Sequence, residues 1–118
     1  ENSIREAPLV GVALWAAQRI VAEATKGQKY AFPRYCSDKG LKADSASATG
    51  NKWIKKQLGT IKTFHCFRHT MNDRLKEVEC PEPIIEAICG WKKDGMVAHY
   101  GQGYSLAKKH EYLLKVAL

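Results

Sequence analysis

Two side chains that lie three residues apart, His65 and Arg68, could together act on a phosphodiester. The planar guanidinium of arginine can bind two phosphate oxygens at once, and an imidazole can donate or accept a proton near neutral pH. Residues three apart on a helix are neighbours, so both groups could act on the same ligand. The H-x-x-R pattern also fits a surface pair without a chemical role, so its meaning depends on the rest of the chain.

The same segment could instead bind a metal ion. His65 and His69 are spaced i, i+4, and with a cysteine they could hold zinc. The four cysteines are spread along the chain without a C-x-x-C pair: Cys36, Cys66, Cys80 and Cys89. With no secretion signal expected ahead of them, they are typical of reduced thiols in a cytoplasmic protein. A metal-binding helical domain therefore stays open as an alternative.

Positive charge is concentrated in the middle of the chain. The sequence has 19 lysines and arginines against 12 aspartates and glutamates, for a net charge of +7. No acidic residue occurs between Ser45 and Asn72, an interval that contains five cations: Lys52, Lys55, Lys56, Lys62 and Arg68. Such a surface attracts polyanions, so we expect the four lysines to contact DNA phosphates. A solvated helix face explains the lysines equally well on local grounds.

The residues around His65 predict a helix. Apolar residues recur there at spacings of three and four, which puts them on one core-facing side: Phe64, Phe67, Met71, Leu75 and Val78. His65 and Arg68 lie off that side, where they can reach a ligand. Thr63 can cap the start of the helix, and Pro81 and Pro83 end the run.

Similar periodicity predicts further helices on both sides. They are expected over residues 10–25, from Ser45 or Ser47 to about residue 58, from Pro83 to Gly90, and from Ser105 onward, with a short helical segment over residues 96–100. Residues 4–10 and 30–32 suit brief strands, and residues 36–50 suit a loop. We expect Trp15 and Trp53 in the core.

Length and composition agree with one folded domain. The chain has 118 residues, of which 45% are hydrophobic and 26% charged, and this excludes wholesale disorder. No apolar run approaches the roughly 20 residues of a membrane span. We predict a single, mainly α (α+β) domain over residues 1–118, with a small strand element at the N-terminus. Because the first residue is Glu1, we expect a piece of a longer protein.

Several ordered motifs make the chain similar to one enzyme family. Residues 63–70 (TFHCFRHT), 88–91 (ICGW) and 99–101 (HYG) resemble the catalytic domain of tyrosine recombinases, the phage and genomic-island integrases. The intervals of 23 residues from Arg68 to Trp91 and nine from Trp91 to Tyr100 are similar to those of the family. Residues 5–9 (REAPL) resemble its R-x-x-P-L strand-to-helix segment, so the likeness spans nearly the whole chain.

The resemblance implies a helical DNA breaking-rejoining core and a role for each motif residue. Tyr100 would attack a scissile phosphate, forming a 3′-phosphotyrosyl bond and leaving a 5′-hydroxyl. Arg68 would hold the nonbridging oxygens, and His65 would serve as general acid or base. Trp91 stands where most members carry a second histidine; its N–H can donate to phosphate but cannot transfer a proton. His69 would support the site beside the DNA.

The resemblance also implies partners and a setting. The protein would integrate or excise a phage or genomic island at double-stranded attachment sites in the bacterial cytoplasm, without a metal or nucleotide cofactor and without a membrane partner. It would self-assemble as a tetramer on DNA, with accessory directionality proteins.

Two of the family's catalytic residues are not expected in this chain. The first catalytic arginine and the hairpin lysine of the family lie upstream of the R-x-x-P-L segment, so we expect the 118 residues alone not to cleave DNA usefully. The main alternative is a noncatalytic helical DNA-binding module, whose basic middle accounts for the charge without any chemistry.

Overall fold

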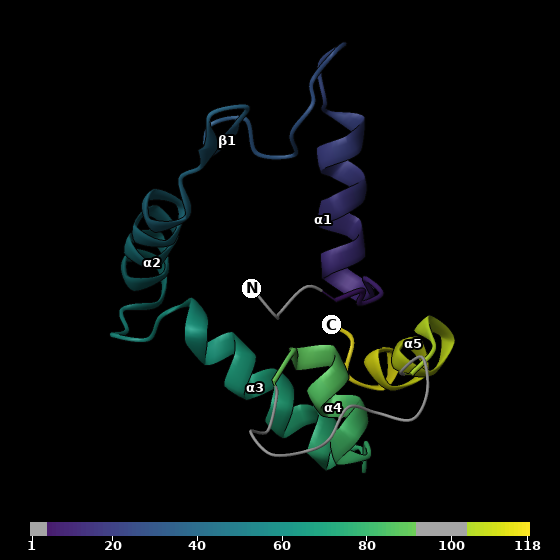
Figure 1. The fold of residues 1–118 in the computed structure, drawn as a ribbon. Helices are drawn as coiled ribbons and strands as arrows, with labels where there is room; N and C mark the ends of the chain where they lie inside the picture. The colour runs from purple at the N-terminus through teal and green to yellow at the C-terminus, as the bar shows by residue number, and fades with distance from the viewer. Residues whose placement is uncertain (1–4, 92–103) are drawn as a thin grey trace. The chain divides into compact units, whose positions relative to one another are not determined.

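The computed structural model describes residues 5–91 and 104–118, and these are mainly helical. The elements, in chain order, are α1 (Gly11–Ala22), β1 (Cys36–Ser37), β2 (Gly40–Leu41), α2 (Ala43–Leu58), α3 (Phe64–Glu77), α4 (Glu82–Cys89) and α5 (Leu106–Lys115) (Figure 1). The prediction of a mainly helical chain is confirmed. The short helix expected over residues 96–100 lies outside the described residues. No described helix has the length and apolar character that crossing a membrane requires.

Contacts between residues group the chain into two compact units. Unit 1 consists of Glu1–Trp15 and His69–Leu118, and unit 2 consists of Ala16–Arg68. The boundaries between them fall inside α1 and α3. Unit 1 is therefore assembled from both ends of the sequence, whereas unit 2 is one continuous stretch.

Unit 1 contains the principal buried core. Its members lie in or next to the second half of α3, α4 and α5, with Cys80 preceding α4 and Val116 following α5: Leu75, Cys80, Ile84, Ile85, Ile88, Cys89, Leu113 and Val116. Leu75 is completely buried, at 0% exposure. The isoleucines of α4 are spaced so that they cover one side of the helix, as the sequence predicted. Burial also raises the pKa of the Cys80 thiol, which keeps this cysteine protonated and unreactive.

The N-terminal segment of unit 1, residues 5–10, is held by side chains and does not form a strand. The Nε of Arg5 donates to the Ile88 carbonyl oxygen at 2.7 Å. The Nζ of Lys109, only 9% exposed, donates to the Glu6 carbonyl oxygen at 2.8 Å. Because a lysine rather than a neighbouring strand satisfies the Glu6 carbonyl, the strand predicted at the N-terminus is wrong.

α4 ends at Gly90, as the sequence predicted. Gly90 has a left-handed φ of 70°, and its N–H donates to the Glu86 carbonyl at 2.7 Å. A Cβ added to Gly90 would lie 2.5 Å from the Nη1 of Arg5. The Arg5 guanidinium thus occupies the space beside Gly90, at the end of the helix where a cation is favourable.

Gly90→Ala should lower the free energy of unfolding by about 2–3 kcal/mol, because it adds left-handed strain and displaces Arg5. Gly59→Ala is the matched control: Gly59 caps α2 with a φ of 57°, and a Cβ there would meet no atom within 4 Å. This control should lose only about 1 kcal/mol. Urea unfolding followed by circular dichroism measures both. If both variants lost the same free energy of unfolding, the contact between Gly90 and Arg5 would make no contribution to stability.

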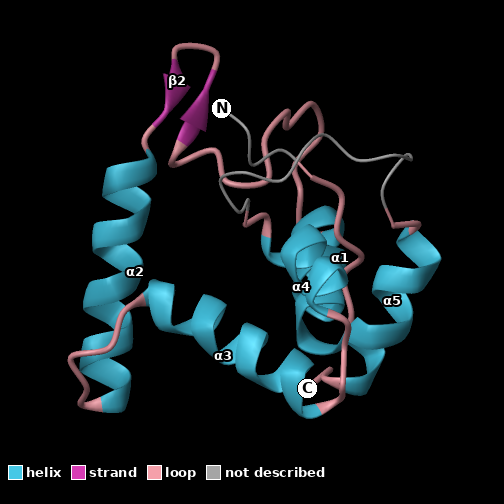
Figure 2. Cartoon of the chain, turned by 60° about the horizontal axis from the view of Figure 1, so that its bottom comes forward, coloured by secondary structure: helices cyan, strands magenta, loops and turns pink. Residues whose placement is uncertain are grey.

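Unit 2 includes the hairpin of β1 and β2, which directly precedes α2 (Figure 2). The strands are antiparallel, with Cys36 opposite Leu41 and Ser37 opposite Gly40. Asp38, in the turn, accepts a hydrogen bond from the Tyr30 hydroxyl at 2.7 Å and pairs with Lys29. The lysine lowers the pKa of Asp38, and the carboxylate raises the pKa of Tyr30.

Three local predictions for unit 2 are therefore wrong. Residues 36–50 are not a loop, because they form the hairpin and the first half of α2. Ser45 and Ser47 lie inside α2, which begins at Ala43, after Lys42 as N-cap. Residues 30–32 form no strand, since the Tyr30 side chain instead bonds to the hairpin turn.

Several aromatic residues expected in the core are exposed. Trp15 is 55% exposed and Trp53 62%, while Phe64 and Phe67 are 49% and 57% exposed. In α2 the buried residue is Ile54, at 3% exposure, and Trp53, one residue earlier, is rotated about 100° away from it. The buried residue of α3, Leu75, lies in its second half. Phe64 and Phe67, at the start of the predicted apolar side, therefore remain exposed.

Candidate nucleic-acid interface

The start of α3, which carries His65 and Arg68, is fixed to α2 by two contacts. The side-chain oxygen of Asn51 accepts a hydrogen bond from the Phe64 N–H at 2.9 Å, satisfying a helix N-terminal donor. The Phe64 ring lies against Gly50, where there is no room for a Cβ. Sequence reasoning missed Asn51, because its partner is 13 residues away and no local capping pattern marks it.

His65 and Arg68 are three residues apart on α3, so they are neighbours on its surface, as predicted. His65 is exposed, but Arg68 is half-buried. Arg68 precedes the buried Leu75 by seven residues, about two helical turns, and so shares its side of α3. The guanidinium therefore lies at the edge of the apolar side instead of well away from it. His69, the next candidate, is exposed.

Trp91 and Tyr100 are the other two catalytic candidates. Trp91 belongs to unit 1, where it is half-buried against the core, and its backbone N–H donates to the Glu86 carbonyl at 3.2 Å. His65 and Arg68 belong to unit 2. Tyr100 lies outside the described residues. Among the described catalytic candidates, the structure brings the H-x-x-R pair together within unit 2.

Unit 2 carries most of the positive charge. By its composition it has a net charge of +8, against −1 for unit 1. Two of its three acidic residues are in ion pairs: Glu23 with Arg19 at 2.5 Å, and Asp38 with Lys29. The net charge of +8 already counts all three acidic residues, so unit 2 as a whole attracts anions.

The lysine face of α2 consists of Lys52, Lys55 and Lys56, all exposed. Lys52 and Lys56 lie on the side of α2 opposite the buried Ile54, and Lys55 lies about 100° around the helix from it. Within the described residues, none of the three has a carboxylate partner. Lys62, between α2 and α3, is also exposed. All four lysines are thus open to solvent, which both a DNA contact and a solvated helix face require.

The described residues contain no candidate metal centre. Within residues 5–91 and 104–118, no three side chains of histidine, cysteine, aspartate or glutamate are placed to hold a metal ion. The His65–His69 pair by itself would supply only two of the four ligands that a structural zinc site needs.

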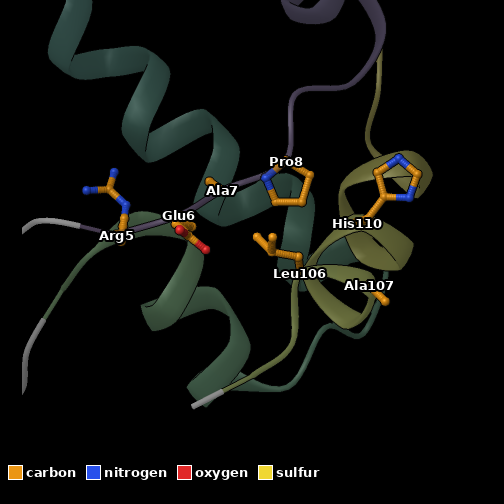
Figure 3. A pocket seen from close by; sticks show the side chains of 7 residues that line it. All are labelled: Arg5, Glu6, Ala7, Pro8, Leu106, Ala107 and His110. Atoms are coloured by element: carbon orange, nitrogen blue, oxygen red, sulfur yellow. The ribbon is translucent and has the colours of Figure 1, made fainter. Parts of the chain in front are cut away.

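Unit 1 has a shallow groove of about 590 Å³ between its N-terminal segment and the start of α5. Pro8 and Leu106 lie on facing sides of it, and the Arg5 guanidinium points away from them (Figure 3). Glu6 and His110 are its other polar side chains. With a carboxylate and mostly apolar walls, the groove is not a phosphate site.

Comparison with known proteins assigns no family. The chain matches no protein-family model, no curated protein and no solved structure. A function must therefore be argued from the residues themselves.

Replacing Lys52, Lys55 and Lys56 together with alanine should weaken DNA binding by at least about tenfold and flatten the salt dependence by about 2–3 in log–log slope, because each phosphate contact releases counterions. Fluorescence anisotropy with a duplex at several salt concentrations measures this. A matched triple in unit 1, of Lys76, Lys108 and Lys115, makes the same change in net charge. If both triples have equal effects, the contribution is one of overall charge and the lysine face is not an interface.

Proposed function

We propose that this chain is the C-terminal part of the catalytic domain of a tyrosine recombinase, which cuts and rejoins DNA through Tyr100. The observation that carries the proposal is the H-x-x-R pair on α3, within a unit of net charge +8. A phosphodiester needs both features: cations to bring the polyanion to the surface, and an arginine with a proton-transferring group at the scissile phosphate.

The proposed chemistry is a transesterification. The phenolic oxygen of Tyr100 bonds to phosphorus, the bond to the 5′ oxygen breaks, and that oxygen takes up a proton. Arg68 offsets the charge that develops on the nonbridging oxygens, and His65 moves a proton as general acid or base. The phosphotyrosyl bond conserves the energy of the phosphodiester, so the reverse attack by a 5′-hydroxyl rejoins the strand without a cofactor.

Trp91 can take part through hydrogen bonding. It follows the left-handed Gly90 cap, and its ring packs against the core of unit 1. A rigidly held indole can present its N–H to a phosphate oxygen, although it donates no proton. In this role the protein acts in the bacterial cytoplasm at double-stranded attachment sites, as a tetramer with directionality proteins, during integration or excision of a phage or genomic island.

A noncatalytic DNA-binding module is the second candidate, and the charge distribution favours it. The excess of cations in unit 2 is sufficient for phosphate binding whether or not any bond is broken. The two candidates agree on DNA as the partner and differ only in the chemistry.

Covalent capture separates the two candidates. The gene product that contains these residues is incubated with nicked duplexes from the DNA that flanks its gene, and the products are run on a denaturing gel. A recombinase gives a protein–DNA band that disappears after protease treatment. Salt-sensitive binding without a band, over the whole flanking region, would favour the noncatalytic module.

A further inference from the structure

Unit 2 exposes aromatic rings that the proposed chemistry does not use. Trp53 on α2 is 62% exposed, and Phe64 and Phe67 on α3 are about half exposed. The two phenylalanine rings contact each other, with centroids 6.1 Å apart and planes tilted by 47°. Singly exposed apolar residues are ordinary, but the Phe64 and Phe67 rings make a contiguous exposed apolar surface, which is typical of a binding site.

These rings and the nearby cations lie on adjoining parts of one unit. Trp53 follows Lys52 and precedes Lys56 by three residues, so its indole borders the lysine face. The Phe64 ring lies against Gly50, one turn before Trp53. We call Trp53, Phe64, Phe67, Lys52, Lys56 and Lys62 the aromatic–basic surface.

A partner for this surface must combine negative charge with flat apolar faces. Double-stranded DNA supplies the charge but hides its base faces in the stack. A single strand offers both, because unpaired bases can stack on aromatic side chains while phosphates meet lysines. An acid-rich protein segment would supply charge but would not match the planar rings.

We infer that unit 2 binds single-stranded nucleic acid, with a base stacked on Trp53 and phosphates held by Lys52 and Lys56. The inference rests on the nucleic-acid part of the proposed function and not on its chemistry. It identifies unpaired strands, such as those exposed when a duplex is opened, as a substrate class for this surface.

The test uses the 118-residue chain and a fluorescein-labelled oligothymidine of about 20 nucleotides, with a duplex of the same length for comparison. Trp53→Leu keeps an apolar side chain but removes the π face. It should weaken oligothymidine binding about tenfold, while duplex binding changes less than about twofold. Trp53→Phe, which retains a ring, should keep most of the affinity. Trp15→Leu removes an exposed indole outside unit 2 and should change neither affinity.

Salt dependence gives a second measurement. Trp53→Leu should leave the log–log salt slope unchanged, because no phosphate contact is lost, whereas Lys52→Ala should reduce it by about 0.7. Binding of an oligouridine of the same length distinguishes RNA from DNA: an affinity equal to that for oligothymidine means that both are accepted, and a weaker affinity means that DNA is preferred. Either result supports a single-strand site.

Two outcomes would overturn the inference. If Trp53→Leu binds oligothymidine as well as wild type does, with circular dichroism showing both folded, then no base stacks on Trp53. If single-strand and duplex affinities fall equally, the indole contributes no stacking. Failure of covalent capture alone would remove the recombinase chemistry and leave this site in place.

Discussion

The Tyr100→Phe variant is expected to form no covalent bond with DNA. Phenylalanine lacks the phenolic oxygen that bonds to phosphorus, so capture should fall by at least about a thousandfold, to background. Noncovalent affinity should remain within about twofold, because one hydroxyl contributes little beside several phosphate contacts. The denaturing gel measures the first quantity and filter binding the second.

Tyr104→Phe is the control for this prediction. Tyr104 lies four residues further along and is 43% exposed, which makes it the nearest rival nucleophile. Its hydroxyl should be dispensable, so this variant should give a band as strong as that of wild type. A band from Tyr100→Phe together with none from Tyr104→Phe would transfer the nucleophile to Tyr104.

Leu75→Ala should be among the most destabilising single substitutions in unit 1. Leu75 is fully buried among the isoleucines of α4 and the apolar residues of α5, so truncation removes buried methyl groups and leaves a cavity. A loss of about 3–4 kcal/mol is expected. Chemical denaturation measures it through the urea midpoint at constant slope.

Leu114→Ala is the matched control, because Leu114 on α5 is 54% exposed. It should cost less than about 1 kcal/mol. If the Leu75 variant lost no more than this, the core around α4 would not govern the stability of the chain.

The helices could be predicted where local signals agree with packing. α4 combines proline in its first turn, three isoleucines on one side and a left-handed Gly90, and it forms as predicted. α5 begins after Ser105, whose side chain accepts from the Lys108 N–H at 3.2 Å. Both helices also bury residues in the core of unit 1, so propensity and tertiary contacts favour the same structure.

The absence of a strand in residues 5–10 and the exposure of the aromatic side chains could not be predicted, because both depend on contacts with distant residues. The N-terminal segment forms hydrogen bonds with Ile88 and Lys109, more than 80 residues away, and no local sequence pattern indicates these partners. Periodicity identified the apolar side of α3 but could not show that only its second half is covered. Helical spacing predicts Trp53 on the buried side of α2, yet the buried residue of this helix is Ile54.

The candidate site was predictable in composition but not in burial. The exposure of the lysine face and of His65 follows from charge and helical spacing. The half-burial of Arg68 does not, since a charged residue on a helix is ordinarily expected in water. Its place on the Leu75 side of α3 follows from the seven-residue interval, but the interval does not show how far along the helix this side is covered.

The side-chain anchors of the N-terminal segment have a consequence for biosynthesis. Arg5 reaches a carbonyl 83 positions later, and Glu6 is held by a lysine 103 positions later. Contacts this distant in sequence form late: on the ribosome the Arg5 bond cannot form until α4 has emerged, and the Glu6 bond cannot form until α5 has emerged. We therefore expect Arg5 and Glu6 to lack these partners until most of the chain has been synthesised.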